Sequence, residues 1–177
     1  MKKKIILLSV LAIGLAACTQ KKADTTTDEQ ALTPLTAAQT VIKEYGADPI
    51  VFDIEDVTDR NENFRTAFWT GTHLQMTLMV LQPGEDIGLE LHTQTDQFIR
   101  VESGEGVVYM GDTEESLDFE QPIKEDFAVF IPAGKWHNLK NTGEEPLKLY
   151  SIYAPVEHEH GTIHKTREEG IQHDHDH

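Results

Sequence analysis

Positive charge and cysteine are both scarce in this sequence. Its 15 lysines and arginines face 31 acidic residues, and the formal net charge is −16. Basic residues cluster only at positions 1–4, so a phosphate backbone would be repelled and nucleic-acid binding is excluded. The one cysteine cannot form an internal disulfide, which excludes a disulfide-stapled secreted domain.

The N-terminus has the pattern of an export signal. A basic start at Met1–Lys4 precedes an apolar run at residues 5–15, which is shorter than the ~20 residues of a membrane span. The run ends in Leu-Ala-Ala-Cys18, which resembles the lipobox of bacterial lipoproteins. The resemblance implies a signal peptide at 1–17 and a lipid on Cys18 that anchors the protein to a membrane of the cell envelope. Thr19 stands where an aspartate would retain a lipoprotein at the inner membrane, which favours the outer membrane in a cell that has one. The expected location is therefore the periplasmic or the outer-membrane face of the envelope.

The segment after the cysteine divides into two parts. Residues 18–33 are rich in threonine, lysine and aspartate, which predicts a flexible tether. Residues 34–49 are interpreted as a helical lead-in. Within it, Thr36–Tyr45 combines a capping box with apolar residues at helical spacing, and Gly46 ends the predicted helix.

Residues 50–156 consist of short apolar runs separated by glycine, proline and asparagine turns. Many short strands with close turns predict an all-β sandwich or barrel, and no helix-length pattern interrupts them. The runs predicted as strands are residues 76–81, 97–101, 107–110, 127–131 and 148–154.

The C-terminal segment, residues 157–177, is rich in histidine and acids. Six of the nine histidines fall between His158 and His177, and the segment lacks apolar periodicity, so no fixed structure is expected there. Two interpretations stay open: the segment gathers metal ions for the domain, or it is an acidic tail without that role.

Four polar residues in the β region point to a metal site. Glu90 and His92 lie two residues apart, so on a strand they leave the same face. Gln97 opens the next predicted strand after a turn, and His137 follows a Pro-Ala-Gly turn. Two imidazoles, a carboxylate and an amide oxygen suit a divalent transition metal, with Asp96 as an alternative ligand to Gln97. Ordinary solvated polar residues are the competing interpretation.

Two motifs in this region resemble those of cupins. The first cupin motif reads Gly, five residues, His-x-His, three or four residues, Glu, six residues, Gly. The present chain has Gly84, Glu90-x-His92, Gln97 and Gly104 in that register.

The second cupin motif reads Gly, five residues, Pro-x-Gly, two residues, His, three residues, Asn. Pro132, Gly134, His137 and Asn141 match it, and Asp126 stands where the first glycine is expected. The match spans roughly residues 76–153. It implies a cupin (double-stranded β-helix, jelly-roll) barrel with a short N-terminal helix and flexible tails.

The resemblance also implies a metal held by Glu90, His92, Gln97 and His137. The family's three histidines and one glutamate become two histidines, one glutamate and one glutamine here, so the metal (Fe, Zn, Mn, Ni or Co) is left open, as is a barrel that has lost its metal. Glu90 is also expected to act as a general base, as a ligating glutamate does in cupin dioxygenases.

The surrounding residues resemble small single-domain bacterial cupins of the mannose-6-phosphate isomerase-like subgroup. We expect a metal-dependent, dioxygenase-like enzyme acting on a small molecule in the cell envelope. The alternatives are a sugar or sugar-phosphate isomerase and a non-catalytic binding lipoprotein. A homodimer is expected from the resemblance. Aromatic residues that could line a pocket over the metal are Trp69, Phe98, Trp136, Tyr150 and Tyr153.

Overall fold

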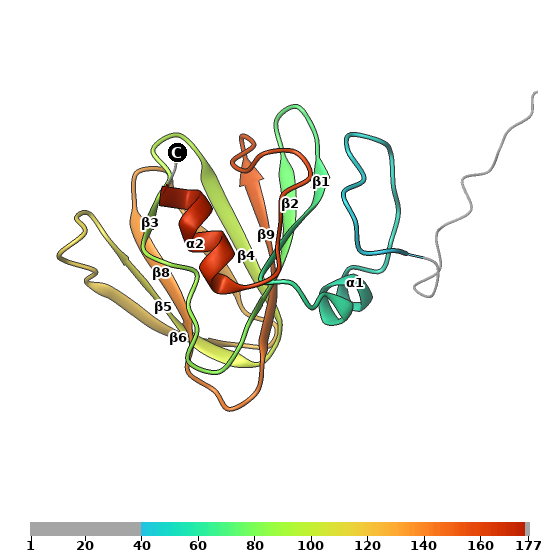
Figure 1. Cartoon of the computed structure of the whole chain (residues 1–177). Coiled ribbons are helices and arrows are strands. Elements are labelled where there is room, and N and C mark those ends of the chain that lie inside the picture. The colour runs from blue at the N-terminus through green and yellow to red at the C-terminus, as the bar shows by residue number, and fades with distance from the viewer. Residues whose placement is uncertain (1–39, 176–177) are drawn as a thin grey trace, which may run out of the picture. The chain divides into compact units, whose positions relative to one another are not determined.

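A computed structural model describes residues 40–175, and Cys18, its signal peptide and its tether lie outside this range. The described chain folds into two antiparallel sheets and two short helices (Figure 1). The elements are α1 (Ile54–Arg60), β1 (Arg65–Thr70), β2 (Gln75–Leu81), β3 (Glu90–Leu91), β4 (Asp96–Ser103), β5 (Glu105–Gly111), β6 (Phe119–Lys124), β7 (Ala128–Ile131), β8 (Trp136–Asn141), β9 (Leu147–Ala154), β10 (Ile163–His164) and α2 (Arg167–His175).

The strands form a six-stranded sheet in the order β10-β1-β2-β9-β4-β7 and a four-stranded sheet in the order β3-β8-β5-β6. Some adjacent strands are far apart in the sequence, such as β2 and β9, whereas others form hairpins, such as β5 and β6. This arrangement confirms the predicted all-β fold class. Neither helix within residues 40–175 is both long and apolar enough to cross a membrane.

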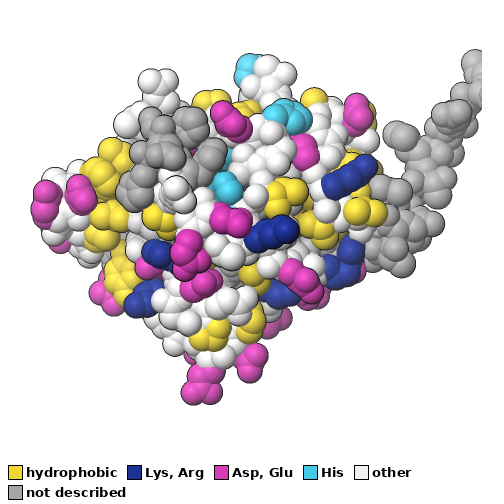
Figure 2. Space-filling view, viewed as in Figure 1, with side chains coloured by type: hydrophobic (Ala, Val, Ile, Leu, Met, Phe, Trp, Pro, Cys, Tyr) yellow, Lys and Arg dark blue, Asp and Glu magenta, His cyan; other side chains and the backbone are white. Residues whose placement is uncertain are grey.

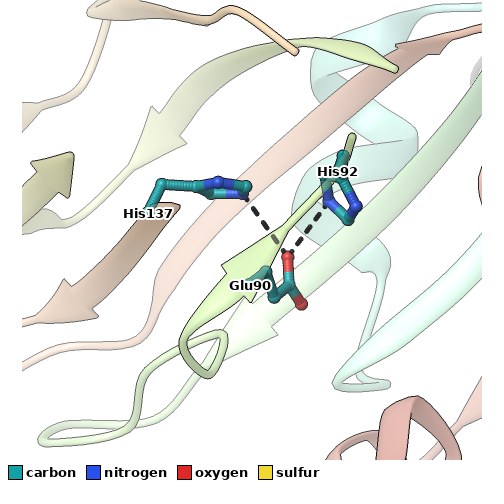
Figure 3. A group of neighbouring side chains, drawn as sticks. All are labelled: Glu90, His92 and His137. Carbon is teal, nitrogen blue, oxygen red and sulfur yellow. Dashed lines mark ion pairs between the residues drawn. The ribbon is translucent and has the colours of Figure 1, made fainter. Parts of the chain in front are cut away.

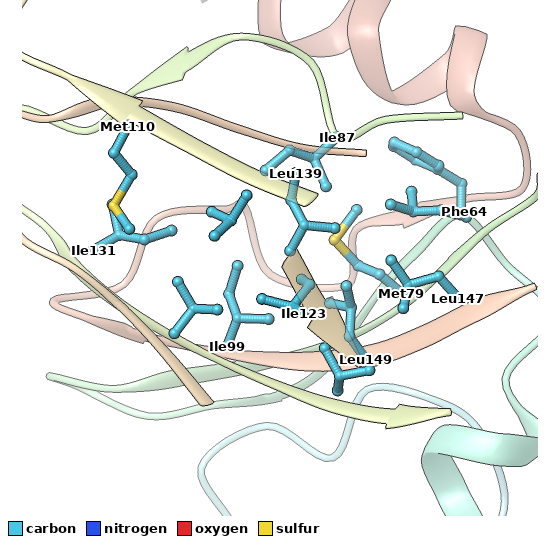
Figure 4. Packing of buried hydrophobic residues seen from close by; sticks show 14 residues of the cluster. Phe64, Met79, Ile87, Ile99, Met110, Ile123, Ile131, Leu139, Leu147 and Leu149 are labelled. Atoms are coloured by element: carbon cyan, nitrogen blue, oxygen red, sulfur yellow. The ribbon is translucent and has the colours of Figure 1, made fainter. Parts of the chain in front are cut away.

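The space between the sheets has an apolar end and a polar end, because side chains alternate along each strand. On β9, Leu147 and Leu149 join the hydrophobic core, whereas Ser151 and Tyr153 continue the same face with polar groups. Figure 4 shows the apolar end, where leucine, isoleucine and methionine side chains from both sheets pack together. The polar end is therefore where a site can form without disrupting the core.

The outer face of the six-stranded sheet carries a second apolar layer. Val57 of α1 packs there with Phe68, Met76 and Leu78. In Figure 1, α1 lies beyond β1 and β2, on the side away from the four-stranded sheet. Because β2 is covered on both faces, all seven of its residues are buried.

The helix predicted at Thr36–Tyr45 is wrong over residues 40–45, which have no helical structure; residues 36–39 lie outside the described range. The backbone N–H of Tyr45 donates to the carbonyl of Phe68 at 2.9 Å, and the two rings pack 5.2 Å apart. This contact with β1 overrides the local helical pattern. The helix that does form begins after Asp53, whose side chain caps it by accepting from the N–H of Asp56 at 3.2 Å.

The C-terminal segment, expected to lack fixed structure, contains β10 and α2. β10 adds to the edge of the six-stranded sheet beside β1. Arg167 at the start of α2 is bound to the carboxylate of Asp86, with Nη2 and Oδ1 2.5 Å apart. The segment is held by tertiary contacts, which a periodicity argument does not detect.

The face of the molecule in Figure 2 shows acidic side chains spread over the surface with basic ones interspersed among them. The acid excess is thus distributed over this face rather than gathered in one patch.

Asn141 joins three backbone segments through its buried side-chain amide. Its buried amide donates to the carbonyls of Leu81 and Glu145 at 2.9 and 2.8 Å, and its oxygen accepts from the N–H of Gly143 at 2.9 Å. We expect Asn141→Ala to lower the free energy of unfolding by about 2–4 kcal/mol, because buried backbone groups lose their partners. Urea unfolding would measure this. Replacing the exposed neighbour, Lys140→Ala, should change stability by less than about 0.5 kcal/mol, and an equal effect of both would contradict the argument.

Candidate metal centre

Strand register brings the first two site residues together. β3 pairs with β8 so that Glu90 lies directly opposite His137. His92 follows two residues after Glu90 and leaves the chain on the same side. The N–H of Gly134, which has φ +81 in the turn before β8, donates to the carbonyl of His92 at 2.8 Å. Glycine adopts this φ without strain, so the turn can tie the two segments together.

The three side chains converge on one point (Figure 3). Oε2 of Glu90 lies 3.4 Å from Nε2 of His92 and 3.6 Å from Nε2 of His137. One ligand atom from each residue falls within 4.8 Å of the others. Atoms bound to one metal at ~2.0–2.2 Å are themselves about 3–3.6 Å apart, so the spacing fits a shared ion.

The remaining polar atom of each residue is held from outside. Nδ1 of His137 is 2.9 Å from the carbonyl of Lys135, and Nδ1 of His92 is 3.0 Å from a carboxylate oxygen of Glu157. Nη2 of Arg65 donates to Oε1 of Glu90 at 2.9 Å. A carbonyl or carboxylate on Nδ1 leaves the Nε2 lone pair free, which is how proteins orient metal-binding histidines.

Gln97 is buried on the inner face of β4, at the polar end of the space between the sheets. Its Nε2 donates to the hydroxyls of Tyr153 and Ser151 at 3.1 and 3.3 Å. The ring of Tyr153 is in turn 5.7 Å from that of His92. Since its amide nitrogen is engaged, Gln97 has its oxygen available, and its role as fourth ligand stays a prediction.

The four predicted ligand atoms share one property. Oε2 of Glu90, Nε2 of His92, Oε1 of Gln97 and Nε2 of His137 are each buried without a hydrogen-bond partner. Buried polar atoms normally find a partner, so four free ones in one region fit a bound cation. The alternative ligand Asp96 is exposed and accepts from the N–H of Ala133 at 2.9 Å, so it does not replace Gln97.

Comparisons with known proteins agree with this architecture. Residues 77–153 match the family described as "Cupin domain". The chain is a cupin. Relatives include protein YrkC of Bacillus subtilis (strain 168), 51% identical over 131 residues that cover 74% of this chain and 70% of YrkC. Protein L612 of Acanthamoeba polyphaga mimivirus is 37% identical over 64% of this chain and 69% of its own.

Among solved structures, the crystal structure of BH2720 from Bacillus halodurans is similar to this cupin, with a TM-score of 0.73 and 54% sequence identity. The similarity covers 74% of this chain and 99% of that one. The relatives thus share the barrel and much of the sequence that builds it.

The charges at the centre of this cupin favour an ionised carboxylate. Burial alone would raise the pKa of Glu90, but the close imidazoles of His137 and His92 and the positive charge of Arg65 hold this pKa well below its usual range. Burial likewise opposes a charged His92, yet its contacts with Glu157 and Glu90 raise the pKa of His92 to about 9. Without metal, a proton on His92 therefore takes the place of the cation.

Of the five aromatic residues considered for a pocket over the metal, the structure brings only Tyr153 to the site. Trp69 belongs to the outer apolar layer. Phe98 lies on the outer face of β4, where its ring packs 5.1 Å from Phe130 and 6.2 Å from Tyr150. Trp136 precedes the inward His137 and so faces the other side of β8. The pocket prediction failed for these four because it ignored which face each residue occupies.

Sequence reasoning missed two residues that orient the centre. Arg65 is a fully buried cation in an otherwise uncharged strand, and such a residue usually has a buried partner. Glu157 belongs to the C-terminal segment, for which the sequence predicts no fixed structure, although it follows the strand that carries Tyr153 by only a few residues. A cation inside a strand was the available signal for Arg65; for Glu157 only the fold reveals the contact.

The pKa of His92 predicts how metal binding depends on pH. A metal must displace the His92 proton, so affinity should rise about tenfold per pH unit from pH 7 and level off near pH 9, with about one proton released per ion. The same proton stabilises the metal-free fold below the ordinary histidine pKa of 6.5, and this stabilisation is lost as pH rises through about 9. Competition titration with a chromophoric chelator would measure the affinity.

The variant Glu157→Gln checks whether the pKa of His92 sets this pH dependence. It removes the strongest contact that raises the pKa of His92, so the plateau should be reached at lower pH. Affinity independent of pH between 7 and 9 in the unaltered protein would contradict this account of the centre.

Proposed function

We propose that this cupin binds one divalent transition metal through Glu90, His92, His137 and Gln97, and that it is a metal-dependent enzyme acting on a small molecule. The observation that carries the proposal is the set of four buried ligand atoms without hydrogen-bond partners. Three of them lie within 4.8 Å of one another. Further support comes from Arg65 and Glu157, which contact Glu90 and His92 from the outer side and orient them.

The types of ligand narrow the chemistry. Two histidines and one carboxylate are the ligands of non-haem iron oxygenases, so iron and an oxygenase-type reaction are our first choice. When bound, the ion would act as a Lewis acid or orient substrate and dioxygen at an open coordination position. The residues around the ligands would orient them and supply compensating charge. The hydrophobic core at the other end of the barrel interior would limit the access of water.

Glu90 has two proposed roles that compete with each other. Its low pKa and its bond to Arg65 make it a strong anionic ligand and a weak base. A general-base role would require the carboxylate to leave a bound ion and to take up a proton despite its contact with Arg65, so we give the ligand role precedence.

Metal content tests the proposal directly. Protein purified without affinity resin should contain about one transition-metal ion per chain, measured by inductively coupled plasma mass spectrometry. We expect His137→Ala to weaken binding at least about 100-fold and Gln97→Ala about tenfold, because the amide is the weaker ligand. Asp96→Asn, on the exposed neighbour, should leave binding unchanged.

The identity of the metal and its response to oxygen separate the reaction classes. Bound iron with oxygen consumption in the presence of small organic acids or sugars supports an oxygenase. Bound zinc with isomerisation of a sugar phosphate, or tight metal binding without turnover, would contradict the oxygenase assignment. No transition metal in the purified protein and no binding on titration would contradict the whole proposal.

We further propose that the domain acts at the cell envelope, anchored by lipid on Cys18. The support is the Leu-Ala-Ala-Cys sequence after a short apolar run. Cys18→Ser should move the protein from the membrane fraction to the soluble fraction of fractionated cells, and intact-mass measurement should show loss of the acyl groups. Unchanged membrane association in this variant would contradict the anchor.

A further inference from the structure

His158 is a second buried histidine at the polar end of the barrel. Its backbone is fixed to Gln75 of β2: its N–H donates to Oε1 of Gln75 at 2.9 Å, and its carbonyl accepts from Nε2 at 2.9 Å. Gln75 is itself fully buried, and its Nε2 also donates to Thr70 at 3.1 Å. The segment after β9 is thus held rigidly against the sheet at this residue.

The ring of His158 stands next to the metal centre. It packs edge-on against Tyr153, with centroids 5.0 Å apart, and the Tyr153 ring lies 5.7 Å from the ring of His92. The preceding residue, Glu157, contacts Nδ1 of His92 at 3.0 Å. The Glu157-His158 pair therefore supplies one side chain to a metal ligand and another to the space beside it.

Nε2 of His158 is buried and has no hydrogen-bond partner. The same holds for the hydroxyl of Thr77, which lies on the inner face of β2 opposite Ser151. Neither residue belongs to the group of converging metal ligands. Buried polar atoms normally have a partner, so these two leave hydrogen-bonding capacity for a polar molecule at this end of the barrel.

The charges in this region favour an anion that also carries a neutral polar group. Glu90 is the one carboxylate among the four proposed ligands, so it offsets only half the charge of a divalent ion, and the guanidinium of Arg65 lies beside it. Burial and the positive charge of Arg65 lower the pKa of His158 to about 3, so its imidazole is neutral. A neutral imidazole offers a hydrogen bond rather than a charge.

We propose that His158 is a positioning residue that hydrogen-bonds the hydroxyl of a small hydroxy acid, or a comparable monoanion, whose charged oxygen binds the metal. This inference rests on the proposed metal centre and names its substrate class. Thr77, two residues after Gln75 on the inner face of β2, provides a second hydrogen-bonding group. Molecules that carry a carboxylate without a neighbouring hydroxyl lose the contact with His158.

Glycolate and acetate are suitable probes, because they differ by one hydroxyl group. Both are titrated into the cobalt-loaded protein, and the change in the visible cobalt spectrum gives the two dissociation constants. We expect glycolate to bind more tightly than acetate in the unaltered protein. His158→Phe should reduce this preference about tenfold, while the affinity for cobalt itself stays the same.

Two further variants test whether His158 positions the bound ligand or only supports the fold. His158→Gln keeps a hydrogen-bonding group and should restore part of the preference, and it also serves if the phenylalanine variant fails to fold. His160→Phe alters an exposed histidine two residues away and should leave the preference unchanged. An equal preference for glycolate in the unaltered protein and in both His158 variants would overturn the assignment.

The outcomes also distinguish a failure of this inference from a failure of the proposed metal centre on which it depends. If cobalt does not bind, the proposed metal centre fails and the probe experiment gives no spectral signal. If cobalt binds but glycolate and acetate bind equally well, the metal centre stands and the role of His158 is overturned. If glycolate is strongly preferred over acetate but the His158 substitutions do not change this preference, the metal alone recognises the hydroxyl group, which also overturns the proposal.

Discussion

The candidate metal centre depends on the antiparallel alignment of residues 85–92 with β8. Glu90 lies opposite His137 only in this register, and a shift by one residue would turn one of the two side chains away. β3 itself is only two residues long. The register is held by backbone bonds on either side: Ile87 donates to Leu139 at 3.0 Å, and Gly134 donates to His92 at 2.8 Å.

A second constraint is the division of the barrel interior. The apolar end supplies the hydrophobic burial that holds the sheets together, so the polar end is free to contain charged groups. Each charge there is matched, as Glu90 is by Arg65 and His92 is by Glu157. Buried charges would otherwise destabilise the fold.

The C-terminal segment links these two parts of the molecule. β10 extends the six-stranded sheet, and Arg167 contacts Asp86 in the segment that leads to β3. Between them and β9 lie Glu157 and His158, which face the centre. A segment for which the sequence predicts no fixed structure thus contributes two residues to the surroundings of the candidate metal centre.

Strand alternation, turn residues and the two spaced motifs determined the fold class and the four ligand candidates from sequence alone, because these signals are local and periodic. The sequence could not say which face Trp69, Phe98, Trp136 and Tyr150 occupy, nor that residues 40–45 would pack against Phe68 instead of forming a helix. Nor could it place Arg65, Glu157 and His158 around the centre. These contacts join segments distant in the chain, so only tertiary structure, through sheet register and burial, decided them.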